Sequence, residues 1–531
     1  MLGSGRSHQE TRAPRPDPAL EVRSAAPADW CAVLALAWPV IAQQLLILLV
    51  SLSDSFLAGH FQPLSPRQQA EIAAHRITAV GLLGGAPSMG GIGGALAAET
   101  SWQAANHLAG RHLAYQSAQT TAHYLSWLIN SYALLVGVGA TALVARFVGA
   151  GDQRSAILAT NQAILLAIVL GLVGSVLGLA GRDRLVVFLQ LQGESLTYAS
   201  AYLRPLFLLL VFQIVEAAGI ACLIGAGDTR TGLYVLASVT VMNLPLAWGF
   251  FHGAGPLPAL GFEGISLGTA LAHVGGACVV LAVLARGRAG LQLRMPLLRP
   301  RWDLLRRLLW VSVPAGFDSL SQVACQLWFL SIVNRLGDEA GTAHGIALRW
   351  EALGYLFAIG FGTAAMSLVG RNLGARRPNE AARSGWLALA MGCAVMTAMA
   401  LVFVVLAPQM FLLFCPNPEQ RHVVAIGVPV LRLVAFAMPA TASWIVFTYA
   451  LRGAGDTRIP VLFTWCGFLC VRIPLAYLLT QSRVDLGPFG SVPGFGLGLF
   501  GAWLAMFADL YVRGSFFLYR FASGRWKRVR V

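Results

Sequence analysis

One polar hexapeptide occurs twice in this chain and indicates an internal duplication. The sequence Gly-Ala-Gly-Asp-Thr-Arg occupies residues 225–230 and returns unchanged at residues 453–458. Each copy follows one long apolar stretch and precedes another. Because an identical glycine-rich peptide at the same place in two apolar halves is hard to obtain by chance, we expect one structural unit that is present twice.

The composition places both units in a membrane. Only 11% of the 531 residues are charged and 57% are hydrophobic, whereas soluble domains carry about 25% charged residues. A spanning helix needs about 20 mostly apolar residues, and the apolar stretches are too long and too uniform for barrel strands. We predict an all-α membrane protein with twelve transmembrane helices, at about residues 32–59, 122–145, 156–181, 197–224, 231–252, 261–285, 308–334, 343–369, 382–407, 423–451, 459–480 and 497–519.

The first six and the last six spans align as pseudo-symmetric halves. Trp38-Pro39 matches Val313-Pro314, and Leu143-Val-Ala-Arg146 matches Leu368-Val-Gly-Arg371. An even number of spans gives both halves the same topology, so an axis along the membrane normal should relate them around a central cavity. We predict six-helix lobes at 32–285 and 308–520, a cytoplasmic linker at 286–307, a polar tail at 1–31 and a basic tail at 521–531.

One segment breaks this symmetry. Residues 62–120 of the first half have no counterpart in the second half, and they are rich in glycine and alanine. Paired glycines disfavour a stable spanning helix. We therefore expect an external insertion, either a partly helical flap or a loop.

The basic residues predict the orientation. The formal net charge is +15, and arginines concentrate in both tails, in the linker and in the loops that follow even-numbered spans. By the positive-inside rule both termini should lie in the cytoplasm, in a protein of the cytoplasmic (inner) membrane. Arginines between apolar stretches suit contacts with membrane lipid, and we expect no nucleic-acid partner.

Several kinds of site are not predicted. The eight cysteines lie mostly in apolar stretches without a carboxylate or histidine cluster, so we expect no metal site. No strand precedes the hexapeptide and no Gly-Lys-Ser/Thr follows it, so it is not a phosphate loop and we expect no nucleotide. No paired catalytic residues stand out, and we predict that the chain is not an enzyme.

The hexapeptides have a simpler structural interpretation. Their glycines end one helix and let the next begin at once, and an aspartate there can cap the free N–H groups of the second helix. Their arginines would face the cytoplasm. The residues assigned this role are Gly225, Gly227, Asp228, Arg230, Gly453, Gly455, Asp456 and Arg458.

Together these motifs resemble one known family. The doubled hexapeptide, with Leu451-Arg452 before the second copy, is similar to the signature of the multidrug and toxic compound extrusion (MATE) family. Asp54, followed by Ala58-Gly-His60, resembles the family's first helix, and residues 360–375 resemble its eighth. The resemblance covers about 32–60 and 121–531. It departs from the family at the insertion, and at Asp318, where a glutamate is often found nearby.

The resemblance implies a secondary active transporter. It would export organic, often cationic or amphipathic, drug-like compounds in exchange for protons or sodium ions, with no other cofactor, by alternating access between two lobes. We expect a monomer. A lipid-linked sugar or polysaccharide flippase with the same twelve-helix plan is the alternative, but it would need a strongly basic cavity, whereas four acids stand beside few arginines within the spans. A membrane enzyme or receptor is a third and weaker reading.

The acidic residues within spans are the candidates for ion coupling. A carboxylate at the middle of a spanning helix costs about 2.5–3.5 kcal/mol, so it needs a reason to be there. Asp54 shares a helix face with Gln43, and Asp318 shares one with Gln322 and Gln326, because these spacings are close to whole turns. We predict that an ion-coupling and substrate cavity is lined by Asp54, Asp318, Glu351, Glu216, Gln43 and Gln322. The competing interpretation pairs these acids with arginines inside spans, such as Arg204, Arg349 or Arg472, to join helices.

Two prolines suggest how such a transporter would move. Pro39 and Pro314 lie at equivalent places near the start of each half, and each removes a backbone hydrogen bond and can bend its helix. Our hypothesis is that protonation of Asp54 changes the bend of the first helix and releases substrate outside. The halves would then rock to face inward.

Overall fold

The computed structural model describes residues 29–59, 128–129, 131–188, 193–253, 257–415, 421–485 and 491–529. The predicted insertion at 62–120 and nearly all of the polar tail lie outside the described residues. The predictions made for them therefore stay predictions.

The described chain is almost entirely helical, and the predicted fold class is confirmed. The first half contains α1 (Trp30–Gly59), the helix Ser131–Gly149, α4 (Gln153–Phe188), α5 (Gly193–Leu208), α6 (Leu210–Ala226), α7 (Thr229–His252) and α8 (Phe262–Ala285). The second half contains α9 (Trp302–Asn334), α10 (Asp338–Gly374), α11 (Pro378–Leu412), α12 (Arg421–Ala454), α13 (Arg458–Trp465), η5 (Cys466–Arg472), α14 (Ile473–Thr480) and α15 (Gly498–Ala522).

Short elements connect or end these helices. The linker between the halves contains the 3₁₀ turns η2 (Arg288–Gly290) and η3 (Met295–Leu298), and η7 (Arg525–Arg528) follows α15. Strands β1 (Arg483–Asp485) and β2 (Ser491–Pro493) form a small antiparallel hairpin between α14 and α15.

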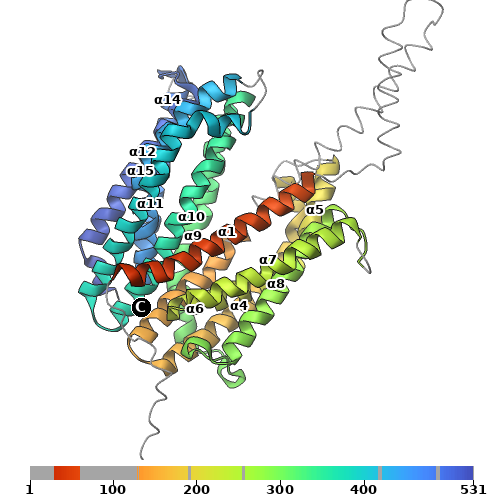
Figure 1. Ribbon diagram of the computed structural model, residues 1–531, viewed down its shortest axis with the longest axis vertical. Helices are drawn as coiled ribbons and strands as arrows, with labels where there is room; N and C mark the ends of the chain where they lie inside the picture. Colours follow the sequence, from red (N-terminus) through yellow and green to blue (C-terminus); the bar gives the residue numbers. More distant parts are fainter. Residues whose placement is uncertain are drawn as a thin grey trace, which may run out of the picture.

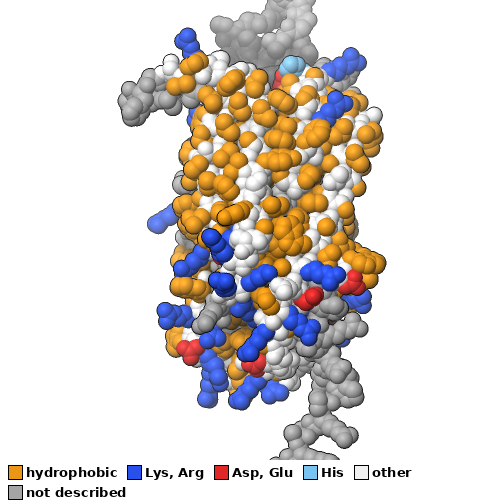
Figure 2. All heavy atoms as spheres, turned by 90° about the vertical axis from the view of Figure 1, so that its left-hand side faces the viewer, with side chains coloured by type: hydrophobic (Ala, Val, Ile, Leu, Met, Phe, Trp, Pro, Cys, Tyr) orange, Lys and Arg blue, Asp and Glu red, His pale blue; other side chains and the backbone are white. Residues whose placement is uncertain are grey.

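Each of the twelve predicted spans coincides with a helical segment. Among the described residues nine helices are long and apolar enough to cross a membrane, and the pair α5–α6 adds a tenth span. The other two, α9 and α15, carry more polar residues, among them Asp318 and Arg513. On the face shown in Figure 2, hydrophobic side chains form a wide band, and most of the lysine and arginine side chains gather toward its lower end.

Two spans depart from a simple straight helix. The pair α5–α6 is bent by 54° at Leu209, four residues after Pro205, whose ring nitrogen cannot donate a backbone hydrogen bond. The segment η5 is a π-helix that joins α13 to α14. The sequence predicted neither feature. In contrast, α1 and α9 continue unbroken through Pro39 and Pro314, and helix bending at these two prolines stays a prediction.

The two halves form separate bundles that meet at one end. In Figure 1 the second half (cyan to blue) and the first half (orange to green) lie close together at the lower end and diverge upward, with α1 (red) between them. We call the lower end the arginine-rich end; it carries both hexapeptides, the linker 286–301 and the tail 523–529. α1 packs against α7 of its own half and α10 of the other.

The first helix of each half begins in the core of the opposite half. Val33, Leu36 and Ala37 of α1 belong to the same buried cluster as α10, α11, α12 and α15, whereas Leu57, farther along α1, belongs to the core of the first half. α9 does the reverse, with Leu308 in the first core and Phe329 in the second. The two lobes are therefore interlocked rather than merely adjacent.

Glycines allow the lobes to touch closely at the arginine-rich end. A Cβ at Gly149 would overlap the backbone oxygen of Arg371, and a Cβ at Gly374 would overlap that of Arg146, as the internal symmetry requires. A side-chain contact also crosses the boundary. Arg146 Nη2 donates to the backbone oxygens of Ala454 at 2.8 Å and Val529 at 2.9 Å.

The hexapeptides end α6 and α12 in the same way. Gly227 and Gly455 take left-handed φ angles of +87° and +83°, which glycine adopts without a steric penalty. The next residues then differ. Asp228 caps α7 by accepting from the Thr231 N–H at 3.0 Å, whereas Asp456 accepts from Arg520 of α15 at 2.7 Å. Arg458 stacks on Trp310, its guanidinium carbon 3.7 Å from the ring centre, and Arg230 is exposed.

Candidate functional site

A cavity of about 500 Å³ lies mainly within the first half. Its walls come from α1, the helix Ser131–Gly149, α5, α6 and α8, and residues of α10 and α12 line it from the other lobe. Most of the lining is aliphatic. The polar side chains that line it are Gln44, Ser51, Asp54, Thr141, Tyr202, Gln213, Glu216, Thr269, His273, Thr363, Tyr449 and Arg452.

Asp54 is one of two acids among the described residues that line this cavity. It is 8% exposed, and its Oδ2 accepts from the Thr269 hydroxyl at 3.3 Å. That hydroxyl accepts in turn from Asn243 Nδ2 at 2.8 Å. Asp54 Oδ1 and Asn243 Oδ1 are buried and find no donor among the described residues. Thr269 thus links Asp54 to Asn243, and each of these two side chains keeps one oxygen without a hydrogen-bond donor among the described residues.

Glu216 is the second acid, and it faces a histidine. Its Oε2 lies 2.7 Å from Nδ1 of His273, which comes from α8. Glu216 is 3% exposed, while the imidazole keeps 20% of its surface accessible. A Cβ at Gly276 would come within 2.8 Å of the Glu216 carboxyl carbon. The absence of a side chain at 276 therefore makes room for the carboxylate.

Gln43 does not line the cavity, and that prediction is corrected. Its side chain is 3% exposed, and its Nε2 donates to the backbone oxygen of Thr229 at the start of α7, at 3.1 Å. Eleven residues are close to three helical turns, so Gln43 and Asp54 do share a face of α1. That face meets α7 at Gln43 and reaches the cavity only farther along, where Gln44 and Asp54 line it.

Asp318 and Gln322 also lie outside the cavity. Asp318 is 1% exposed and accepts from Arg452 Nη2 at 2.9 Å and from Gln322 Nε2 at 3.2 Å. The ion pair joins α9 to α12, as the competing interpretation of the acids proposed, although with a different arginine. Arg452 itself lines the cavity.

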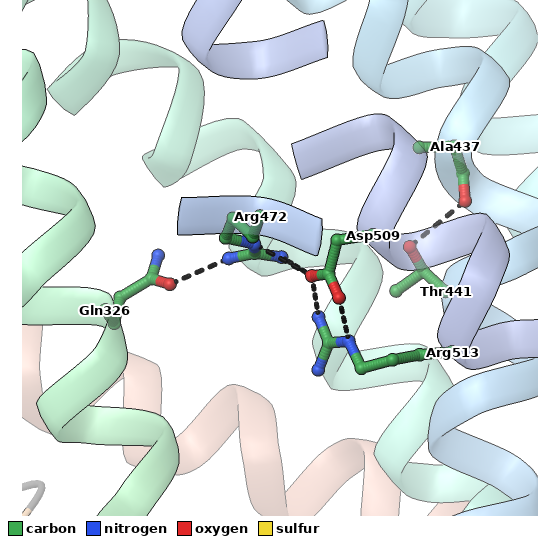
Figure 3. Close-up of polar contacts among 6 residues, drawn as sticks. All are labelled: Gln326, Ala437, Thr441, Arg472, Asp509 and Arg513. Atoms are coloured by element: carbon green, nitrogen blue, oxygen red, sulfur yellow. Dashed lines mark hydrogen bonds and ion pairs between the residues drawn. The ribbon is translucent and has the colours of Figure 1, made fainter. Parts of the chain in front are cut away.

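Glu351 belongs to a charged network inside the second half. It is 4% exposed and interacts electrostatically with Arg472 and Arg513. Figure 3 shows Asp509 between the two guanidinium groups, with Arg472 Nη2 and Arg513 Nη2 at 2.7 Å and 2.6 Å from Oδ2. Arg472 also donates to Gln326 at 3.0 Å. Glu351 lies apart from the cavity of Asp54 and Glu216, so the structure does not bring the four acids into one chamber.

The site residues that were not predicted include Asn243, Thr269, His273 and Arg452. The last two could have been found, because an ionisable side chain inside or at the end of an apolar span has the same cost that singled out the acids. Asn243 and Thr269 carry no such signal, since uncharged polar residues are common in spans. Only the packing of α7 against α8 brings them together.

Comparison with known proteins gives the family. A model of the MatE family matches residues 105–248 and 314–478, more than half of the chain. A probable multidrug resistance protein NorM of Thermotoga maritima is 26% identical over 408 residues, 76% of this chain and 84% of that protein. The multidrug resistance protein MdtK of Proteus mirabilis is 26% identical over 379 residues, 69% of this chain and 80% of that protein.

Solved structures share the fold. One is described as an outward-facing conformation of a multidrug resistance MATE family transporter; it has a TM-score of 0.75 at 19% identity, over 96% of this chain and 99% of that one. A transporter from Pyrococcus furiosus has a TM-score of 0.76 at 18% identity, with the same coverage. The chain therefore belongs to the MatE family, the multidrug and toxic compound extrusion transporters that its sequence motifs resemble.

Proposed function

We propose that this protein exports organic, cationic or amphipathic compounds in exchange for protons or sodium ions, and that Asp54 binds the coupling ion. The observation that carries the proposal is the buried carboxylate of Asp54 in a largely aliphatic cavity, with one oxygen that lacks a donor among the described residues. Burial in a medium of low dielectric favours a bound proton on such a group or a nearby cation.

The donor set beside Asp54 suits a small hard cation as well as a proton. Asp54 Oδ1, Asn243 Oδ1 and the Thr269 hydroxyl are all oxygens, the ligand type that hard cations prefer. A proton would instead satisfy the carboxylate alone. Transport measured with only a sodium gradient, and then with only a pH gradient, shows which of the two ions is exchanged.

The charges around the cavity favour a cationic substrate over a phosphorylated one. Asp54 and Glu216 line it, while the charge of Arg452, the one arginine among its described lining residues, is balanced by Asp318 at 2.9 Å. A pyrophosphate group would require several unpaired basic side chains. The lining therefore supports drug-like cations rather than the lipid-linked sugars of the alternative function.

The names of the relatives agree with export of such compounds. The relatives from Thermotoga maritima and Proteus mirabilis are named as multidrug resistance proteins. By the positive-inside rule, we place the arginine-rich end on the cytoplasmic side of a bacterial inner membrane. Rocking of the lobes, without nucleotide and within one monomer, would then move the cavity between the two sides.

Transport by Asp54→Asn in proteoliposomes tests the proposal. We expect wild-type protein to move ethidium against its gradient when a pH or a sodium gradient is imposed. The variant should still bind ethidium but should lose accumulation, because Asn cannot exchange a proton or balance a cation. Asp183→Asn, which removes a carboxylate that is 63% exposed on α4, is the matched control. Undiminished accumulation by Asp54→Asn would remove Asp54 from the mechanism.

A further inference from the structure

The Glu216–His273 pair has no part in the ion-coupling proposal, yet both side chains line the cavity. Glu216 comes from α6 and His273 from α8, with 2.7 Å between Oε2 and Nδ1. Gly276, one turn after His273, leaves the space that the carboxylate occupies. Two helices and a glycine thus hold this contact at the cavity wall.

The other ionisable groups around the cavity have different partners. Asp54 of α1 interacts electrostatically with His273 and is hydrogen-bonded to Thr269. Tyr202 of α5 and Tyr449 of α12 also line the cavity, as does Arg452, which is bound to Asp318. Among the described lining residues α7 contributes Leu236 and no charge. Glu216 is therefore the cavity carboxylate whose direct partner can itself gain or lose a charge.

A buried carboxylate needs a positive charge beside it, because an ionised group in apolar surroundings is costly unless it is paired. A protonated imidazole can supply that charge, and histidine is the side chain that ordinarily changes its charge between about pH 5 and pH 8. The positively charged nitrogen of an organic compound can supply it equally well. Both would bind the same carboxylate, so they would exclude one another.

We propose that Glu216 anchors the positively charged nitrogen of the substrate and that His273 is its displaceable counter-charge. When the substrate cation binds Glu216, the proton on His273 leaves for the cavity water and the imidazole becomes neutral. One positive charge enters and one departs, so the charge of the cavity does not change. This assignment rests on the proposed export of cations, but it gives Glu216 and Asp54 separate tasks.

Proton release on binding tests this assignment. Ethidium, whose positive charge is on a ring nitrogen, is added to the purified full-length protein in nanodiscs, in weak buffer with a pH indicator, and its affinity is measured from pH 5.5 to 8. We expect wild-type protein to release about one proton more per bound cation than His273→Gln. The affinity of wild-type protein should fall on acidification by up to about tenfold per pH unit, the slope of a one-for-one exchange. That of His273→Gln should lose this slope.

Three further variants complete the test. Glu216→Gln should weaken binding of the cation at least about tenfold, the loss of one charge-assisted contact. The double variant Glu216→His/His273→Glu restores the pair in reversed order and should recover both affinity and proton release. His344→Gln, which changes a buried histidine of the second half that is not among the cavity residues, is the matched control.

The outcomes separate this assignment from the coupling proposal. If His273→Gln keeps the proton release and pH slope of wild-type protein, or Glu216→Gln binds the cation as tightly, the assignment is wrong even where Asp54→Asn abolishes accumulation. If Asp54→Asn accumulates ethidium normally while His273→Gln loses proton release, the coupling proposal fails and the assignment stands. If a single variant fails to fold, the double variant Glu216→His/His273→Glu still tests the assignment, since it should bind the cation and release a proton as the wild-type protein does.

Discussion

Asp228 and Asp456 occupy the same position of an identical hexapeptide and yet make different contacts. Asp228 caps α7 and also accepts from Arg288 of the linker at 3.0 Å, whereas Asp456 accepts from Arg520 at the end of α15. The sequence predicted a capping role for either residue. The difference arises from what the fold places beside each copy, since a linker follows the first lobe and a terminal tail follows the second.

Substitution of each aspartate should separate the two contacts. Asp228→Ala removes a helix cap and should destabilise the protein by about 1 kcal/mol. Asp456→Ala leaves Arg520 without its carboxylate in a mostly buried position, and we expect a loss of about 3 kcal/mol. Thermal unfolding of the purified variants measures both, and equal losses would show that the contacts are interchangeable.

A third aspartate, at an exposed site, should make the stability of the protein depend on pH. Asp152 precedes α4 and accepts from the Ser155 N–H at 3.0 Å, and hydrogen bonds from Ser155 hold the pKa of this carboxyl below its ordinary value. Because the folded-state pKa is lowered, the stabilisation is present above about pH 4 and is lost as the pH falls through the folded pKa. Asp152→Ala should therefore cost about 0.5–1 kcal/mol at pH 7 and almost nothing near pH 2. A constant difference across that range would contradict the cap.

The Asp318–Arg452 pair can be tested by a double substitution. Asp318→Asn leaves a buried arginine uncompensated and should lower stability by about 3–5 kcal/mol. Adding Arg452→Gln should recover most of that loss, because neither charge then remains. If Asp318 instead couples transport, the single variant should keep its stability and lose ethidium accumulation. Thermal unfolding and proteoliposome transport, measured on the same preparations, distinguish these results.

The cost of placing a charge inside a span identifies acids that are buried, but it does not identify which of them line the cavity. The four candidate acids are all buried, but only Asp54 and Glu216 of them line the cavity. Asp318 and Glu351 have the same sequence signal but different surroundings, because Arg452 of α12 binds Asp318 at 2.9 Å and Glu351 interacts electrostatically with Arg472. A partner more than a hundred residues away leaves no mark in the local sequence.

At the scale of elements, long apolar stretches were predictable and their irregularities were not. The predicted spans lie close to the observed helices because a run of about 20 apolar residues can cross a membrane only as a helix or as part of a closed barrel. The 54° bend between α5 and α6 follows Pro205, but prolines also lie within α1, α9 and α12, where the helix continues. A proline permits a break, and neighbouring helices decide whether it occurs.

One glycine of the π-helix η5 lies directly against the charged side chains of α15. A Cβ at Gly467 would overlap Oδ1 of Asp509 and the side chain of Arg513. This segment also ends at Arg472, which binds the same aspartate, and π-segments often occur at functional sites. The glycine thus lets the Arg472–Asp509–Arg513 network close.

Gly467→Ala should consequently strain that network. We expect a loss of about 1–3 kcal/mol, the usual effect of overpacking, visible as a lower thermal unfolding temperature. Gly181→Ala in α4 is the control, since a Cβ there meets no atom within 4 Å. Stability of Gly467→Ala equal to that of the control would mean that the network has room to move aside.

Across the whole molecule, the duplication was visible in the sequence but the interlocking was not. Matched motifs predicted two lobes, and both hydrophobic cores exist. No local pattern shows that the first turns of α1 pack in the second lobe and those of α9 in the first. Apolar residues suit either core equally, so only the path of the chain decides which one they join.

Arg146 should control how firmly the lobes stay together at the arginine-rich end. Arg146→Ala removes its two hydrogen bonds to backbone oxygens of the other lobe. Each bond contributes at most about 1.5–3 kcal/mol to the free energy that holds the lobes together at this end. We expect the population in which this end is open to rise at least about tenfold. Spin labels at residues 230 and 377, in a variant without native cysteines, measure the distance. Arg154→Ala is the control, and an unchanged distance distribution in Arg146→Ala would contradict the prediction.

The interlocking of α1 and α9 also bears on how the protein is made. While the ribosome is still translating the first six spans, Val33, Leu36 and Ala37 have no second-lobe core to join, because its earliest helix begins at Trp302. Assembly of the first lobe must therefore wait for later insertion events, and such long-range closure is slow and open to error. Truncated chains that end in the linker should be substrates for membrane proteases, and separately translated halves should survive only when made together.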